Sequence, residues 1–95
     1  MTRKKHALSL LNKALQELER EIAQHEKSNG KVSDINQLHR FKIHIKNMLD
    51  EIESGEFSPK NQRDRGITYT VADSWGPGIE LGELLAKAEF AYREL

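Results

Sequence analysis

The sequence contains no cysteine, which excludes disulfide bonds, thiolate metal sites and cysteine nucleophiles. It also lacks any apolar run near the roughly 20 residues that a membrane-spanning helix requires. The basic start at residues 1–6 is like that of a signal peptide, but polar residues soon interrupt the apolar stretch that follows, and no cleavage site appears. We therefore expect a cytoplasmic protein that contains no membrane segment.

The chain also lacks an excess of either charge. Fifteen basic residues balance fifteen acidic ones, so the formal net charge is zero and strong attraction of the whole protein to nucleic acid or to an anionic membrane is not expected. Hydrophobic residues make up only 37% of the chain, but their regular spacing favours a folded chain over a disordered one. We expect residues 1–95 to form a single domain with one modest core.

Regularly spaced apolar residues predict two long amphipathic helices, at 4–28 and 34–54. The apolar residues recur in steps of three and four, which places them on one face of each helix. They are Leu8, Leu11, Leu15, Leu18 and Ile22 in the first helix, and Leu38, Phe41, Ile45, Met48 and Ile52 in the second. Ser28-Asn29-Gly30 is a good stop for the first helix, and Ser33 or Asp34 is a good cap for the second. Because the linker is short, the two helices should form an antiparallel hairpin.

Part of the second helix has a competing interpretation. Phe41, Ile43 and Ile45 alternate with polar residues, as the residues of a half-buried strand do. The helical spacing continues on both sides of this stretch, and no turn signal interrupts it. We therefore favour the helix.

Residues 55–78 differ from the rest of the chain, because they hold both prolines and four of the six glycines. We expect an extended loop here. Residues 67–71 are rich in types that favour strands, so a short strand within the loop is a second reading. Such a strand would pair with residues 56–58, lie as extended chain on the helices, or pair with a second copy of the protein.

A third helix is predicted at 79–95. Its apolar face comprises Leu81, Leu84, Leu85, Ala88, Ala91, Tyr92 and Leu95. Gly82 lies in its first turns and would permit a close approach to a neighbouring helix. The expected fold is therefore all-α: a helical hairpin, a long loop and a C-terminal helix that packs on the hairpin as in a three-helix bundle.

The segment 69–78 holds the only tryptophan and is the most distinctive part of the chain. One interpretation is that Trp75 closes the open end of the hairpin and anchors the loop. The other is that Trp75 and Tyr69 anchor a protein partner, with Asp73 beside them. Both hold if Trp75 is only partly buried. Gly76-Pro77-Gly78 could present backbone amides to an anion, but it lacks the lysine and the spacing of a phosphate-binding loop.

Charge is unevenly placed along the chain. Acidic residues gather at 50–56, at the end of the second helix, and Lys60, Arg63 and Arg65 follow closely. The simpler interpretation is a charge match across the turn within the chain. The alternative makes Arg63 and Arg65 part of a surface that binds a partner.

Glu17, Glu21 and His25 share one helix face and are the best candidates for metal ligands. They match no closed ligand set, and a solvated helix face explains them more simply. No set of side chains with the spacing of a catalytic centre emerges. We therefore expect no catalytic residue, no metal site and no cofactor.

Several features together resemble the small soluble YfmB-like proteins of Bacillus-type bacteria. They are the overall length, the charged helical hairpin, the Asp73-Ser74-Trp75 segment and the short leucine-rich helix that ends in Tyr92-Arg93-Glu94-Leu95. This resemblance implies a cytoplasmic bacterial protein, and it brings with it no activity and no site residue.

These features together predict a non-enzymatic protein-interaction or regulatory protein, for which a homodimer is one option. The alternative is a nucleic-acid-binding regulator that uses separate basic patches at 3–5, 40–46 and 60–65. The only aromatic residue among these patches is Phe41, which belongs to the apolar face of its helix. These patches therefore offer no exposed aromatic side chain on which bases could stack, so nucleic acid is the less favoured partner.

Overall fold

The structure, a computed structural model, describes residues 2–26, 35–75 and 79–95. Its elements are α1 (Arg3–Glu26), α2 (Ile35–Ser54), the 3₁₀ turn η1 (Lys60–Gln62), α3 (Ile67–Thr70), the π-helical turn η2 (Val71–Trp75) and α4 (Glu80–Arg93). This described part is helical and contains no strand, so the prediction of an all-α protein is confirmed for it. None of its helices is long and apolar enough to cross a membrane. Ser28-Asn29-Gly30, Ser33, Asp34 and Gly76-Pro77-Gly78 lie outside the described residues.

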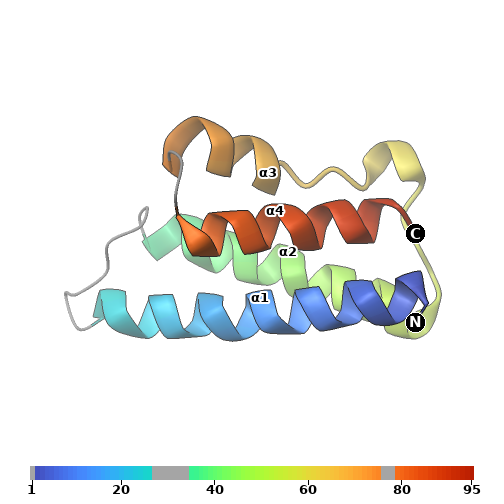
Figure 1. The fold of residues 1–95 in the computed structure, drawn as a ribbon, viewed down its shortest axis with the longest axis horizontal. Helices are drawn as coiled ribbons and strands as arrows, with labels where there is room; N and C mark the ends of the chain where they lie inside the picture. Colours follow the sequence, from blue (N-terminus) through green and yellow to red (C-terminus); the bar gives the residue numbers. More distant parts are fainter. Residues whose placement is uncertain (1, 27–34, 76–78) are drawn as a thin grey trace.

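The three long helices lie side by side, and α1 packs against both α2 and α4. Figure 1 shows that α1 runs in one direction while α2 and α4 run in the other. The short helix α3 and the turn η2 pack on α4, on its side away from α1 (Figure 1). This arrangement leaves the seam between α1 and α4 open along one face of the molecule.

Helix α1 buries a wide face because it packs against two helices. The buried line runs through Ala7, Leu11, Ala14, Leu18 and Ile22. Leu8 and Leu15, which the spacing placed in the central stripe, lie half-buried beside this line. Alanines at the centre of the contact allow the neighbouring helices to approach α1 closely, because the distance between packed helices depends on the side chains between them.

In α2 the predicted stripe lies in the core: Leu38, Phe41, Ile45, Met48 and Ile52 are buried, together with Leu49. Ile43 is 57% exposed, because the helix turns it away from its neighbours Phe41 and Ile45. Helix α2 ends at Ser54, the predicted last residue, and Gly55 follows it. Its φ of 77° lies in the left-handed region, and its N–H donates to the carbonyl oxygen of Glu51 at 2.9 Å.

The prediction of an extended loop at 55–78 is wrong at residues 60–62 and 67–75, where the structure forms η1, α3 and η2. The alternative of a short strand at 67–71 is wrong as well, because these residues are helical. Gly66, at φ 77°, turns the chain into α3, and its N–H donates to Oδ1 of Asp64 at 2.9 Å. The first N–H groups of α3 then donate to the carboxylate of Glu89 in α4. This tertiary contact satisfies the free donors of a helix start, and it outweighs the strand propensity of the local sequence.

Gly82 of α4 lies against η2. A Cβ atom at this position would stand 2.7 Å from Cγ1 of Val71 and 3.2 Å from Cε3 of Trp75. The close approach that the glycine was expected to permit is therefore made to the segment that precedes α4. On the rest of its inner face α4 buries Leu85, Ala88, Glu89 and Tyr92.

Candidate functional site

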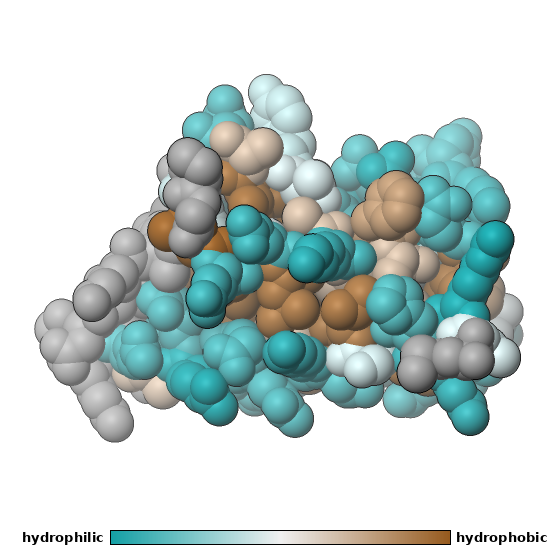
Figure 2. All heavy atoms as spheres, in the orientation of Figure 1, coloured by the Kyte–Doolittle hydropathy of each residue, from teal (hydrophilic) through white to brown (hydrophobic). Residues whose placement is uncertain are grey.

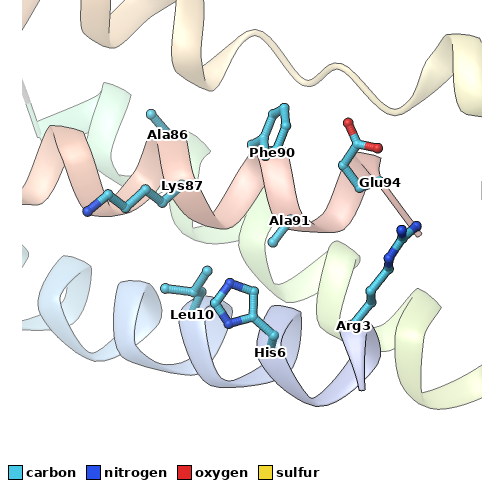
Figure 3. Close-up of a pocket in the computed structure, with 8 residues that line it drawn as sticks. All are labelled: Arg3, His6, Leu10, Ala86, Lys87, Phe90, Ala91 and Glu94. Atoms are coloured by element: carbon cyan, nitrogen blue, oxygen red, sulfur yellow. The ribbon is translucent and has the colours of Figure 1, made fainter. Parts of the chain in front are cut away.

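A groove follows the seam between the start of α1 and the end of α4. It is lined by Arg3, His6 and Leu10 from α1, and by Ala86, Lys87, Phe90, Ala91 and Glu94 from the α4 side (Figure 3). Its volume of about 740 Å³ lies within the usual range of ligand pockets, roughly 300–1,000 Å³. The groove, which we call the Phe90 groove, is open to solvent along its length.

The seam continues as a second hollow of about 490 Å³ toward the start of α4. This hollow shares Leu10 and Lys87 with the Phe90 groove, and it adds the apolar side chains of Leu81 and Leu84. Charged side chains complete its lining: Lys13, Glu17, Arg20, Glu80 and Glu83. Figure 2 shows apolar surface gathered between α1 and α4, with hydrophilic atoms along both borders. The apolar floor of the seam thus extends beside most of α4.

Phe90 is the largest exposed apolar side chain of the seam, and 61% of its surface is accessible. The alanines Ala86 and Ala91 lie near it and leave room for an inserted side chain. Isolated apolar residues are common on protein surfaces, but an aromatic side chain beside an apolar groove is a typical anchor of a binding site.

Cations predominate around Phe90. Arg3 and Lys87 line the Phe90 groove, and Lys60 and Arg93 line a smaller hollow on the other side of Phe90. Both hollows also include the carboxylate of Glu94. The lining of these two hollows therefore holds four cations and one carboxylate, in a chain whose formal net charge is zero.

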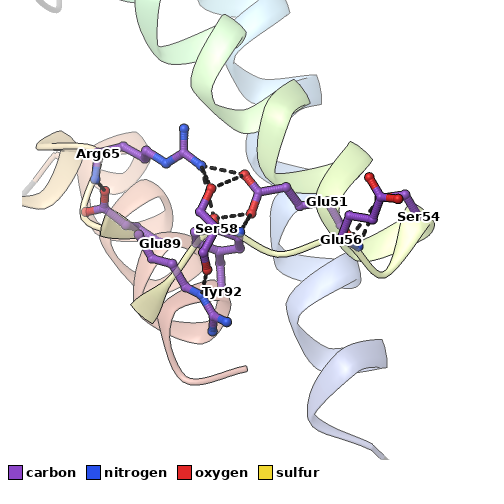
Figure 4. Close-up of polar contacts among 8 residues, drawn as sticks. Glu51, Ser54, Glu56, Ser58, Arg65, Glu89 and Tyr92 are labelled. Atoms are coloured by element: carbon purple, nitrogen blue, oxygen red, sulfur yellow. Dashed lines mark hydrogen bonds and ion pairs between the residues drawn. The ribbon is translucent and has the colours of Figure 1, made fainter. Parts of the chain in front are cut away.

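Behind the seam, a polar cluster fixes the end of α4 to α2; we call it the Glu51 cluster. Nη2 of Arg65 donates to Oε2 of Glu51 at 2.5 Å and to the Tyr92 hydroxyl at 3.1 Å. The Tyr92 hydroxyl donates in turn to Oε1 of Glu51 at 2.7 Å. The backbone N–H of Ser58 donates to the same oxygen at 2.8 Å, and its hydroxyl donates to Oε2 at 3.1 Å (Figure 4). One carboxylate thus joins α2, the following loop and α4.

These contacts change the acidity of the Glu51 cluster. Burial by itself would raise the pKa of Glu51, but the hydrogen bonds from Ser58 and Tyr92 and the charge of Arg65 outweigh it and lower the pKa. For Tyr92, burial and the hydrogen bond to Glu51 raise the pKa above its ordinary value. The cluster therefore keeps a charged carboxylate beside a neutral phenol at neutral pH, and both groups are engaged in holding the fold together.

Arg63 is buried to 7% exposure between aromatic rings. Its guanidinium carbon lies 5.0 Å from the ring centre of Phe57 and 6.0 Å from that of Tyr92, and its Nε donates to the Ser58 carbonyl at 2.9 Å. Nη1 has no hydrogen-bond partner among the described residues. The aromatic faces take the place of such a partner, because the ring quadrupole attracts the cation.

The five predicted partner-binding residues do not share one exposed surface. Trp75 is only 9% exposed, and its Nε1 donates to Oε1 of Gln37 in α2 at 2.8 Å. Arg63 is buried as well, and Arg65 is held in the Glu51 cluster, where its ion pair with Glu51 is part of the predicted charge match across the turn. Tyr69 is 74% exposed, and Asp73 is also exposed.

Trp75 therefore stabilises the fold rather than forming an exposed binding surface. Its ring centre lies 5.7 Å from that of Phe41, and the ring also packs over Gly82. These contacts fasten η2 to α2 and α4. Of the predicted aromatic pair, only Tyr69 remains available to a partner.

The candidate metal ligands give no support for a metal site. Glu17 makes an ion pair with Arg20 at 3.1 Å, and the side chain of His25 lies outside the described part. Within that part, no group of three or more histidine, aspartate or glutamate side chains is arranged to hold a metal ion.

Sequence reasoning missed both Phe90 and Glu89. A signal for Phe90 existed, because it is an aromatic residue outside the predicted apolar face of its helix. No comparable signal existed for Glu89, since a glutamate in a charged amphipathic helix is ordinarily exposed. Its burial depends on the docking of a segment more than 20 residues away.

The chain matches no protein-family model, and a search of curated proteins found no significant match.

Proposed function

We propose that this protein is a non-enzymatic interaction protein that docks a partner protein in the Phe90 groove. The observation that carries the proposal is the exposed Phe90 ring beside an open groove with an apolar floor between two packed helices. Aromatic anchors in such positions contribute most of the binding energy of many protein interfaces.

The α4 side of the groove is held rigidly in place. The Glu51 cluster joins the end of α4 to α2. Hydrogen bonds, as well as apolar packing, therefore hold the α4 wall of the groove in place. A rigid surface loses little conformational entropy when a partner binds, which favours docking on preformed walls.

Nucleic acid is the alternative partner, because cations surround Phe90. The Glu94 carboxylate lines both hollows beside Phe90 and would repel a phosphate group there. The apolar floor is also better matched to a protein than to a sugar–phosphate backbone.

Affinity capture from nuclease-treated lysate of the cells that express the protein tests the proposal. The bait proteins are the wild type, Phe90→Ala and Tyr69→Ala, with folding verified by circular dichroism. The two variants are matched, since each removes an exposed aromatic ring from a different helix. We expect the wild type and Tyr69→Ala to retain the same protein and Phe90→Ala to lose it.

Three results would contradict the proposal. Equal capture of the partner by the wild type and Phe90→Ala would show that the Phe90 groove is not the docking site. Loss of the partner in Tyr69→Ala alone would move the docking site to α3. A partner that is captured from a parallel untreated lysate but not from the nuclease-treated one would favour the nucleic-acid alternative.

A further inference from the structure

We infer that the occupant of the Phe90 groove is an acidic amphipathic helix of a partner protein. This inference rests on the proposed docking function and adds the chemistry of the docking segment. Three features of the seam carry it: its shape, its charge and its length.

The shape of the groove favours a helix. Two helices packed side by side form a trough, and a third helix fills such a trough by packing its side-chain ridges against both. The seam between α1 and α4 is a trough of this kind, and its floor is made of aliphatic and small residues: Leu10, Leu81, Leu84, Ala86 and Ala91. An amphipathic helix would cover this floor with the apolar residues of one face.

The charge around the groove favours acidic flanks on that helix. Among the described residues, Arg3, Lys60 and Lys87 make no ion pair, whereas Arg93 is 4.0 Å from Asp64. Three cations without ion pairs thus stand around Phe90, against the one carboxylate of Glu94. Carboxylates beside the apolar stripe, at the end of the docking helix that lies here, would meet them, and complementary charge steers association and selects the partner. The second hollow is balanced in charge, because its lining holds three acidic and three basic residues: Glu17, Glu80, Glu83, Lys13, Arg20 and Lys87.

The length of the seam sets the length of the segment. Helix α4 has 14 residues, which corresponds to roughly 21 Å of helix. The two hollows together follow α4 from Glu80 to Glu94. A docking helix of about four turns, with apolar residues spaced by three and four, would therefore span the whole floor.

Selection from a library of displayed helices tests the inference without knowledge of the natural partner. Each 16-residue peptide carries a fixed leucine stripe, and its flanking positions are randomised among Asp, Glu, Lys, Arg, Ser and Gln. The full-length protein is the target, and Phe90→Ala serves for counter-selection. We expect the retained peptides to be enriched in acidic flanks.

Fluorescence anisotropy with one selected peptide then measures the contributions separately. We expect at least about tenfold weaker binding for Phe90→Ala and no change for Tyr69→Ala. A version of the peptide with lysine in place of every flanking acid should also bind at least about tenfold more weakly, and binding of the acidic peptide should weaken with added salt.

Charge reversal supplies the decisive comparison. Arg3 and Lys87 are both exposed, and glutamate suits the first turn of a helix such as α1, so Arg3→Glu/Lys87→Glu should keep the fold. This double variant should prefer the lysine-flanked peptide over the acidic one.

Several outcomes would overturn the inference. They are enrichment of neutral or basic flanks, recovery of no peptide that depends on Phe90, an unchanged preference in the double variant, and displacement of the peptide by duplex DNA at an equal concentration. If Phe90→Ala still loses the cellular partner in such a case, the docking function stands and only the acidic helix is excluded. If acidic peptides bind while cellular capture is independent of Phe90, the docking function is the part that fails.

Discussion

The carboxylate of Glu89 in α4 holds the first turn of α3 through Thr68. Its Oε1 accepts hydrogen bonds from the Thr68 backbone N–H at 2.9 Å and from the Thr68 hydroxyl at 2.6 Å. Its Oε2 accepts from the N–H groups of Arg65 at 2.9 Å and Ile67 at 3.4 Å. Glu89 itself has no exposed surface. A glutamate from one helix thus performs the capping role that a local side chain usually performs for another.

Substitution of Glu89 should destabilise the fold. Glu89→Gln keeps the size of the side chain but replaces one acceptor oxygen by an amide group that can only donate, so buried N–H groups lose their acceptor. We expect a loss of about 1–3 kcal/mol in the free energy of unfolding. Urea denaturation followed by circular dichroism measures it, with Glu53→Gln on the exposed side of α2 as a control of unchanged stability. Equal stability of both variants would show that the cap contributes nothing.

The lowered pKa of Glu51 predicts acid sensitivity. Because the folded pKa lies below the ordinary value of 4.5, the unfolded state binds the proton more tightly than the folded state does. The stabilisation is therefore fully present above that value and is lost as the pH falls through the folded pKa. Unfolding free energies between pH 6 and pH 3 should fall less steeply for Glu51→Gln than for the wild type. Parallel curves would show that Glu51 does not titrate differently in the two states.

His44 predicts a second, milder dependence at higher pH. Its Nδ1 is buried without a hydrogen-bond partner among the described residues. Burial, assisted by the charges of Arg65 and Arg40 and opposed by that of Glu89, lowers the pKa of His44 below 6.5. The unfolded state therefore binds the proton more readily, so stability is full above pH 6.5 and declines as the pH falls below it.

Comparison of two histidine variants isolates this effect. We expect His44→Gln to lose less stability than the wild type between pH 7.5 and pH 5.5, a window that lies above the titration of Glu51. His39→Gln, on the exposed face of the same helix, should retain the wild-type dependence. The interpretation fails if the pH dependence follows His39 instead.

Gly82 should not tolerate a methyl group. Alanine is favoured over glycine in a helix by about 1 kcal/mol. Here, however, its Cβ would lie 2.7 Å from Cγ1 of the buried Val71, whose β-branched side chain cannot rotate freely. We expect Gly82→Ala to be net destabilising by about 1–2 kcal/mol, because overpacking outweighs propensity. Thermal unfolding measures this loss.

A double-mutant cycle tests the cause. Val71→Ala makes room for the new methyl group, so Gly82→Ala should cost less in that background than in the wild type. Additive losses would place the cost elsewhere, outside the contact with Val71.

The sequence by itself determined the long helices. Steps of three and four between apolar residues are a local property, and they placed helices within one or two residues of the starts of α1, α2 and α4. The end of α2 at Ser54 also agrees with the predicted boundary, and the left-handed conformation of Gly55 accounts for it. The choice of helix over strand at Ile43 was also correct, because the helical spacing extends beyond the alternating stretch.

Only the tertiary structure decided the form of residues 55–75 and the location of the candidate site. Strand-favouring residues became α3 because Glu89, far along the chain, satisfies its first N–H groups. Trp75 lies in the core because it packs against Phe41 of α2 and donates a hydrogen bond to Gln37 of the same helix. The Phe90 groove exists because α4 docks beside α1 and leaves their seam open. Each of these outcomes depends on which helix faces meet, and spacing along a single segment does not specify that.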